Sequence, residues 1–192
     1  MTSGDLTLDR PGYGRGSIAV HWLTVLLLVG VYACMELREF YPRGSDIREA
    51  LKTWHYQLGL TVFILAWIRL ALRLRPGAPR LQAPSGPAWT VWLARATHLF
   101  LYAMILALPL AGWMILSAEG DPIPFWGLSL PPLTAPNHGL AETLEEGHEL
   151  IATLGYAVIA LHAVGALVHH YVFKDAVLVS MAPWVKRGGA AS

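Results

Sequence analysis

Four long stretches without a charged side chain dominate the sequence. They contain 20, 16, 23 and 24 residues, and they lie between Arg15 and Glu36, Lys52 and Arg69, Arg95 and Glu119, and Glu149 and Lys174. About 20 apolar residues in a helix cross the hydrocarbon core of a bilayer, so three of the stretches are long enough alone. The second becomes long enough if Arg69 extends its guanidinium to the lipid headgroups and the helix continues past it. The pattern predicts four transmembrane helices, at about 16–37, 50–74, 90–118 and 142–173, within one domain spanning 14–184.

The composition excludes several other classes of protein. The chain is 55% hydrophobic and 14% charged, whereas a soluble domain averages about 45–50% and about 25%. Four buried helices of a soluble protein would therefore lack the polar residues needed to cover them. The net charge of +1 provides no basic field, so we expect no nucleic-acid partner. The single cysteine, Cys34, excludes an internal disulfide, four-cysteine metal sites and covalent CxxCH haem attachment. We expect an all-α membrane protein surrounded by lipid.

The distribution of Lys and Arg predicts the orientation. If the N-terminus is inside, the outer segments carry four cations, all in the first loop: Arg38, Arg43, Arg48 and Lys52. The inner segments then carry ten, namely Arg10, Arg15, Arg69, Arg73, Arg75, Arg80, Arg95, Lys174, Lys186 and Arg187. Because cytoplasmic loops of membrane proteins are enriched in Lys and Arg, both termini are predicted to be cytoplasmic.

Histidines lie at two depths of the predicted bundle. His148 and His162 are 14 residues apart on the fourth stretch, which places them on one helix face about 21 Å apart, with Gly155 midway between them. His55 matches His148 in depth on the outer side, and His21 roughly matches His162 on the inner side. Ionisable groups inside a membrane indicate function. Two imidazoles at each depth predict two stacked six-coordinate haems, and iron without an open position favours electron transfer.

Other interpretations of the histidines stay open at this point. A membrane histidine can simply hydrogen-bond a neighbouring helix, and for His98, His169 and His170 we expect this or a quinone contact rather than iron ligation. His138 is expected in solvent in the outer loop. Zinc is a weaker alternative, because a tetrahedral site needs three or four converging ligands. A proton-coupled transporter that uses membrane histidines is the non-redox alternative.

Short motifs on three of the predicted helices carry a family resemblance. They are SIAVHWL at 17–23, HYQLG at 55–59, RLALRL at 69–74, GHE at 147–149, LGY at 154–156, LHA at 161–163, HHY at 169–171 and KD at 174–175. Together they resemble the bacterial cytochrome b561 family, which includes the di-haem b subunits of membrane hydrogenases and formate dehydrogenases. The resemblance implies two non-covalent b haems and quinone chemistry in the bacterial inner membrane. It assigns His21 and His162 to the inner iron, and His55 and His148 to the outer iron.

The first outer loop indicates a subgroup. MELR at 35–38, FYPR at 40–43 and an acidic, proline-rich outer loop resemble the members described as superoxide oxidases, which implies superoxide oxidation at the outer face and ubiquinone reduction in the membrane. The four outer cations, Arg38, Arg43, Arg48 and Lys52, could steer an anion toward the outer haem, or they could pair with the many outer carboxylates.

A rival function is a membrane-anchor subunit that passes electrons between a dehydrogenase or hydrogenase and quinone. Such a subunit needs a surface on which its soluble partner docks. The predicted tails are short and carry no extended docking segment, so no obligatory protein partner is expected.

Overall fold

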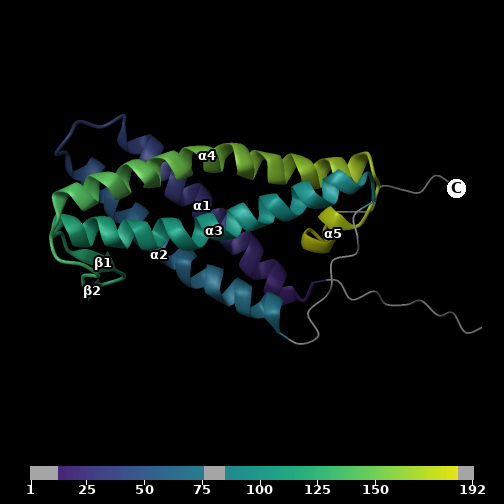
Figure 1. Cartoon of the computed structure of the whole chain (residues 1–192), viewed down its shortest axis with the longest axis horizontal. Coiled ribbons are helices and arrows are strands. Elements are labelled where there is room, and N and C mark those ends of the chain that lie inside the picture. The colour runs from purple at the N-terminus through teal and green to yellow at the C-terminus, as the bar shows by residue number, and fades with distance from the viewer. Residues whose placement is uncertain (1–12, 76–84, 186–192) are drawn as a thin grey trace, which may run out of the picture.

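The computed structural model describes residues 13–75 and 85–185, and within them four long helices run side by side along one axis (Figure 1). The helices are α1 (Arg15–Arg38), α2 (Asp46–Leu74), α3 (Ala88–Glu119) and α4 (His138–Tyr171). Each is long and apolar enough to cross a membrane. The predicted four-helix transmembrane bundle is therefore confirmed.

Two helices begin earlier than the charge pattern suggests, because polar side chains cap them. The hydroxyl of Ser45 accepts the backbone N–H of Arg48 at 3.4 Å, so α2 begins at Asp46 rather than near 50. The side chain of Asn137 caps α4 in the same way, so α4 begins at His138 rather than near 142. Such caps satisfy N–H groups that the first helical turn leaves unpaired. His138, expected in a loop, is the exposed first residue of α4.

A short β-hairpin between α3 and α4 departs from the all-α expectation. Strands β1 (Ile123–Phe125) and β2 (Leu128–Leu130) pair antiparallel, with Phe125 opposite Leu128. The two residues between them, Trp126 and Gly127, have φ of 47° and 85°, as the tight type I′ hairpin turn requires. A bulky residue rarely adopts this conformation, so the proline-rich sequence gave no signal for the hairpin. A short helix, α5 (Val177–Met181), follows α4.

The packing leaves space between two of the helices. Helix α1 lies against α2, α3 lies against α4, and α2 contacts α3. Val62 and Ala66 of α2 and Met104 and Ile105 of α3 form the main buried cluster. The backbones of α1 and α4 are not closely packed in the described part of the chain. The space between α1 and α4 is therefore filled by side chains or by a ligand.

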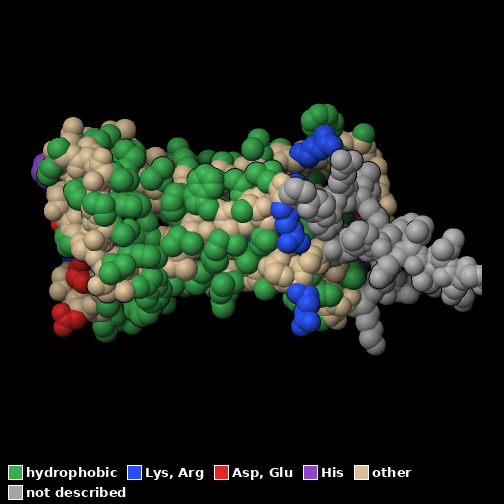
Figure 2. Space-filling view, turned by 90° about the horizontal axis from the view of Figure 1, so that it is seen from below, with side chains coloured by type: hydrophobic (Ala, Val, Ile, Leu, Met, Phe, Trp, Pro, Cys, Tyr) green, Lys and Arg blue, Asp and Glu red, His purple; other side chains and the backbone are tan. Residues whose placement is uncertain are grey.

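The surface has the character of a membrane protein. Figure 2 shows a broad apolar band along the middle of the molecule, Lys and Arg toward one end, and Asp and Glu at the other. Apolar side chains in the middle of α1, such as Leu26 and Val29, are largely exposed, and they would contact lipid tails. We call the acidic end, with residues 39–45 and 121–136, the hairpin end; the opposite end, with α5, is the termini end. Four of the cations counted for orientation, Arg10, Arg80, Lys186 and Arg187, lie outside the described residues.

Candidate haem-binding sites

One pair of imidazoles faces each other near the hairpin end. His55 projects from α2 and His148 from α4, and their ring centres lie 6.2 Å apart with an angle of 60° between the ring planes. The Nδ1 atom of His55 lies 3.1 Å from the backbone oxygen of Val31. This hydrogen bond orients the ring and leaves Nε2 available to a metal, as is usual for histidine ligands.

A second pair lies near the termini end. The ring centres of His21 on α1 and His162 on α4 are 6.3 Å apart, with 71° between the ring planes. A bond from a metal to an imidazole nitrogen is about 2.0–2.1 Å long, so a single metal atom bonded to a nitrogen of each ring would keep the two ring centres roughly 6 Å apart. Both histidine pairs therefore have a separation that suits one iron atom between them.

Two nitrogen atoms of these histidines have unmet hydrogen-bonding capacity. Nδ1 of His21 and Nδ1 of His148 are buried, and neither has a hydrogen-bond partner among the described residues. Buried polar atoms are nearly always satisfied in folded proteins. Each of these two rings thus has a buried nitrogen that the described residues leave unpaired, whereas Nδ1 of His55 is held by Val31.

The hairpin-end pair lines a cavity of about 620 Å³ inside the bundle. All four long helices contribute to its walls, and Ile123 of the hairpin, with Leu60 and Leu116, closes one side. Cofactor pockets in proteins usually occupy about 300–1,000 Å³ and are largely apolar. The volume and the lining both suit a large, flat, apolar cofactor such as haem.

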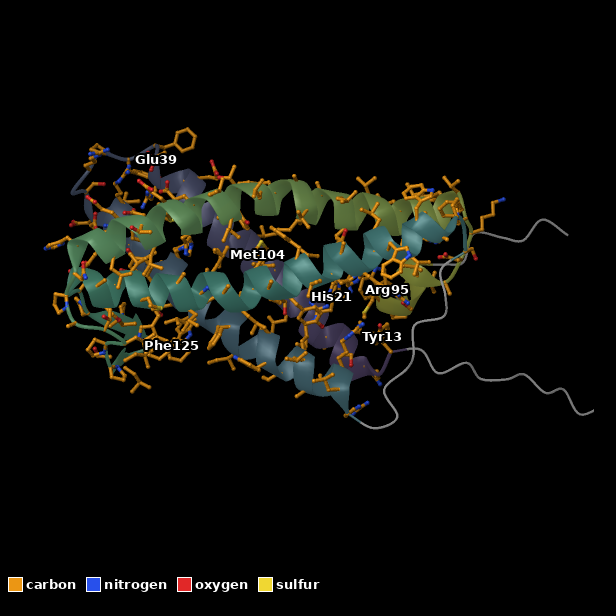
Figure 3. All side chains as sticks on the ribbon, viewed as in Figure 1. Tyr13, His21, Glu39, Arg95, Met104 and Phe125 are labelled. Atoms are coloured by element: carbon orange, nitrogen blue, oxygen red, sulfur yellow. The ribbon has the colours of Figure 1, made fainter. Side chains whose placement is uncertain are left out.

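Gly155 separates the two sites. A Cβ atom at this position would collide with the hydroxyl of Tyr32 and would lie 2.7 Å from the sulfur of Met104. Met104 lies midway along the bundle in Figure 3, and Tyr32 donates a hydrogen bond to the backbone oxygen of Ala152 at 2.8 Å. The absence of a side chain at Gly155 thus makes room for Tyr32 and Met104 between the two histidine pairs.

His98 lies close to the termini-end pair. Its ring centre is 5.0 Å from that of His162, which is shorter than the separation in either histidine pair. Its Nδ1 atom is 2.6 Å from the oxygen of Ala94 in the same helix. The hydrogen bond predicted for His98 is present, but it is made within α3 rather than to another helix.

His169 and His170 are both buried at the end of α4. Nδ1 of His169 lies 2.7 Å from a carboxylate oxygen of Asp175, because the chain turns back at Lys174, whose φ is 53°. The same carboxylate oxygen accepts the backbone N–H of Ser85 at 3.1 Å. No spacing rule within one helix predicts the contact of His169 with Asp175, which follows α4. Within the described ranges, no three His, Cys, Asp or Glu side chains converge as a metal-ion site, so the zinc alternative gains no support.

Most of the outer cations predicted to steer an anion are engaged in ion pairs. Arg38 and Arg48 share a carboxylate oxygen of Glu39, each at 3.0 Å, and Lys52 lies 3.1 Å from Glu49. Arg48 also donates to the backbone oxygens of Arg38, the last residue of α1, and of Tyr41 in the α1–α2 loop, so it holds the start of that loop in place. Three of the four outer cations are therefore paired with carboxylates, which is the alternative that the sequence left open.

Only two of the four cations line the cavity among its described residues. These are Arg38 and Lys52, whereas Arg43 is exposed in the loop. Carboxylates outnumber them in the lining, which includes Glu36, Glu39, Glu119, Asp121, Glu145 and Glu149. The local field at the cavity mouth is therefore mixed, with a negative excess that the loop cations do not remove.

A polar contact between α1 and α4 was missed by sequence reasoning. The hydroxyl of Tyr156 donates to Glu36 at 2.6 Å, and the rings of Tyr156 and Tyr32 lie 4.5 Å apart. These contacts bridge the gap between α1 and α4 beside the cavity. No local pattern could have found them, since they join residues 120 apart in the chain.

A membrane bundle with facing imidazole pairs is typical of membrane cytochromes, and comparisons with known proteins identify the family. The family described as "Prokaryotic cytochrome b561" matches residues 12–184. The chain is 36% identical to cytochrome b561 homolog 1 of Escherichia coli K12 over 171 residues, which are 89% of this chain and 97% of that protein. It is 37% identical to the probable superoxide oxidase CybB of Yersinia pestis over 176 residues, 92% of this chain and 98% of the relative. It is 30% identical to cytochrome b561 homolog 2 of E. coli K12 over 173 residues, 88% and 90% of the two chains.

The chain therefore belongs to the prokaryotic cytochrome b561 family. The resemblance seen in the sequence is confirmed. Membership makes it a membrane electron-transfer protein, and the family implies that it binds haem b.

Proposed function

We propose that this protein is a di-haem cytochrome b that oxidises superoxide at its hairpin end and reduces ubiquinone in the membrane. His55 and His148 would hold one haem iron, and His21 and His162 the other. The observation that carries the proposal is the pair of imidazole separations, 6.2 Å and 6.3 Å, which both suit a single iron between two histidines.

The electron balance sets the stoichiometry. Each superoxide loses one electron and becomes O₂, whereas ubiquinone takes two electrons and two protons to become ubiquinol, so two superoxide ions are consumed for each quinol. Haem supplies an iron that carries one electron at a time, and the protein supplies position and surroundings. The residues of this chain hold the imidazoles in place, as Val31 does for His55, and surround the cavity with apolar side chains.

Two observations support superoxide as the electron donor. One relative carries the name probable superoxide oxidase. Lys52 also lies three residues before His55 on α2 and lines the cavity with Arg38, so a cation stands beside the proposed site for an anionic substrate. The role of these cations in steering is part of the proposal.

The proposed orientation places the hairpin end outside and both termini in the cytoplasm of a bacterial inner membrane. In the described ranges the termini end carries Arg15, Arg69, Arg73, Arg75, Arg95 and Lys174. The hairpin end carries only the four loop cations and ten of the eleven described carboxylates. This asymmetry supports the orientation under the rule that cytoplasmic segments are rich in Lys and Arg.

The decisive experiment counts haems in purified protein and in single histidine variants. We expect two b-type haems per wild-type chain in a reduced-minus-oxidised spectrum. His55→Ala and His162→Ala should each lose one spectrally distinct haem, while His138→Ala, at the exposed start of α4, should keep both. A colourless protein, or two haems in both ligand variants, would contradict the proposal.

A kinetic assay separates the proposed reaction from the anchor-subunit alternative. The purified chain alone should consume superoxide and form about one ubiquinol for every two superoxide ions. A di-haem protein that is inactive with superoxide, and that co-purifies with a dehydrogenase or hydrogenase, would instead favour the membrane-anchor function.

A further inference from the structure

Arg69 on α2 reaches the depth of the termini-end histidine pair. It follows His55 by 14 residues on α2, and His162 follows His148 by the same number on α4. The two helices run in the same direction and His55 faces His148, so equal steps of about 21 Å bring Arg69 and His162 to the same level.

The half-buried side chain of Arg69 reaches an aromatic ring of α3. Its central carbon lies 5.6 Å from the ring centre of Tyr102. Since Arg69 also lies at the level of His162, its guanidinium is at the depth of the proposed termini-end haem.

Arg69 has no counter-anion among the described residues. Its guanidinium makes no ion pair or side-chain hydrogen bond in the ranges 13–75 and 85–185. The one described carboxylate at this end, Asp175, is already bonded to His169 and to two backbone N–H groups. A cation that no described carboxylate compensates is available to an anionic ligand.

Tyr13 does not supply the missing negative charge. It lies just before α1, close enough for the charges of Arg69 and Arg73 to act on it. Burial raises the pKa of its phenol above the ordinary value of 10.0, although the arginines oppose that shift. The phenol therefore stays protonated and neutral under physiological conditions.

We propose that Arg69 binds the propionate carboxylates of the haem at the termini-end site. Haem carries two carboxylates and would supply the missing anion at this depth. No described side chain bonds to the guanidinium N–H groups of Arg69, and their fork suits a carboxylate. This inference rests on the proposed function, since it requires a haem between His21 and His162.

The charge of Arg69 would also tune that haem. A positive charge next to the haem favours the reduced iron, which carries one positive charge less than the oxidised iron. Arg69 would thus raise the midpoint potential of the termini-end haem relative to the same site without the charge. An electron arriving from the hairpin end would then be drawn toward this haem.

The test compares purified holoproteins carrying Arg69→Gln, Arg69→Lys and Arg95→Gln. Arg95 is a matched control, because it also stacks on an aromatic ring, with 5.2 Å to Trp92, but its side chain is exposed. Potentiometric titration gives the potential of each haem, and redox-difference infrared spectra report the propionate carboxylate bands. The haem between His55 and His148 serves as an internal reference for folding in every variant.

We expect Arg69→Gln to lower the potential of the termini-end haem alone and to shift its carboxylate bands. Arg69→Lys keeps the charge but loses the fork, so it should shift the bands with little change in potential. Arg95→Gln should change neither. If Arg69→Gln loses the termini-end haem, the carboxylate bands in the infrared spectrum of Arg69→Lys test the inference instead.

Carboxylate bands unchanged in the Arg69 variants would overturn the inference, whatever the potential does. That result would mean that Arg69 pairs elsewhere, for example with a lipid phosphate, while two haems per chain would leave the proposed function intact. A wild-type protein without a haem between His21 and His162 would instead contradict the proposed function itself. The two failures are therefore distinguishable.

Discussion

At the scale of single residues, Gly155 shows how closely the space between the two histidine pairs is filled. We expect Gly155→Ala to destabilise the protein by about 1–3 kcal/mol, because the new methyl group would overlap the hydroxyl of Tyr32 and crowd the sulfur of Met104. The loss should appear as a lower midpoint of thermal unfolding in detergent.

Gly165 provides the matched control on the same helix. A Cβ atom there meets nothing within 4 Å, so Gly165→Ala should be neutral or stabilising by up to about 1 kcal/mol, through reduced backbone freedom. Equal unfolding midpoints for the two alanine variants would show that Tyr32 and Met104 can move away from Gly155 at no cost.

The sequence predicted the histidines better than it predicted their surroundings. Helical periodicity places His148 and His162 on one face, and the structure brings His55 and His21 opposite them. The haem assignment itself stays a prediction. The contact of Tyr156 with Glu36 and the stacking of Arg69 on Tyr102 depend on how whole helices approach each other, which residue spacing within one helix cannot reveal.

At the scale of elements, the hairpin is attached to the bundle by side chains of α3. The hydroxyl of Ser117 is buried, accepts the backbone N–H of Leu133 at 3.0 Å and donates to the oxygen of Trp113 at 2.7 Å. The indole of Trp113 donates in turn to the oxygen of Pro131 at 2.9 Å. These bonds hold the segment after β2 against α3, where the hairpin closes the cavity.

We expect Ser117→Ala to cost about 1–3 kcal/mol, because it leaves the N–H of Leu133 without a partner. Amide hydrogen exchange at Leu133 should become faster, and the unfolding midpoint should fall. Thr143→Ala is the control, since that exposed hydroxyl bonds only to Gly139 of its own helix; its effect should stay within about 0.5 kcal/mol. Unchanged exchange at Leu133 in the Ser117 variant would mean that the hairpin does not depend on this bond.

The elements were predictable to different degrees for physical reasons. The lengths of the charge-free stretches were enough to predict the four helices, because a helix needs about 20 apolar residues to cross a bilayer. The ends of α2 and α4 depend on the caps Ser45 and Asn137, which act over three residues and extend each helix into a polar segment. The hairpin has no such signal, since its turn places Trp126 in a conformation that a tryptophan rarely adopts.

At the scale of the whole molecule, the order of the helices creates the sites. Packing of α1 on α2 and of α3 on α4 leaves α1 and α4 apart. Helix α4 contributes one histidine to each pair, and these face His21 of α1 and His55 of α2. The core of Val62, Ala66, Met104 and Ile105 joins the two helix pairs on the other side. Helix α4 can thus position both proposed haems, because its rise per residue fixes the distance between His148 and His162 along its axis.

The charges around the cavity predict how the proposed superoxide reaction responds to salt. Lys52 lines the cavity, whereas Arg43 is exposed in the loop and does not appear in the described lining. Two unit charges about 4 Å apart in water interact by about 1 kcal/mol, so Lys52→Gln should slow superoxide oxidation roughly fivefold at low salt. Glu145→Gln removes a lining carboxylate and should accelerate the reaction, while Arg43→Gln should leave the rate unchanged.

The rate differences of Lys52→Gln and Glu145→Gln from the wild type should shrink as the screening length falls from about 30 Å at 0.01 M salt to about 8 Å at 0.15 M. Stopped-flow rates that are equal for Lys52→Gln and Glu145→Gln, or independent of salt, would remove electrostatic steering from the mechanism and leave the haem sites unaffected.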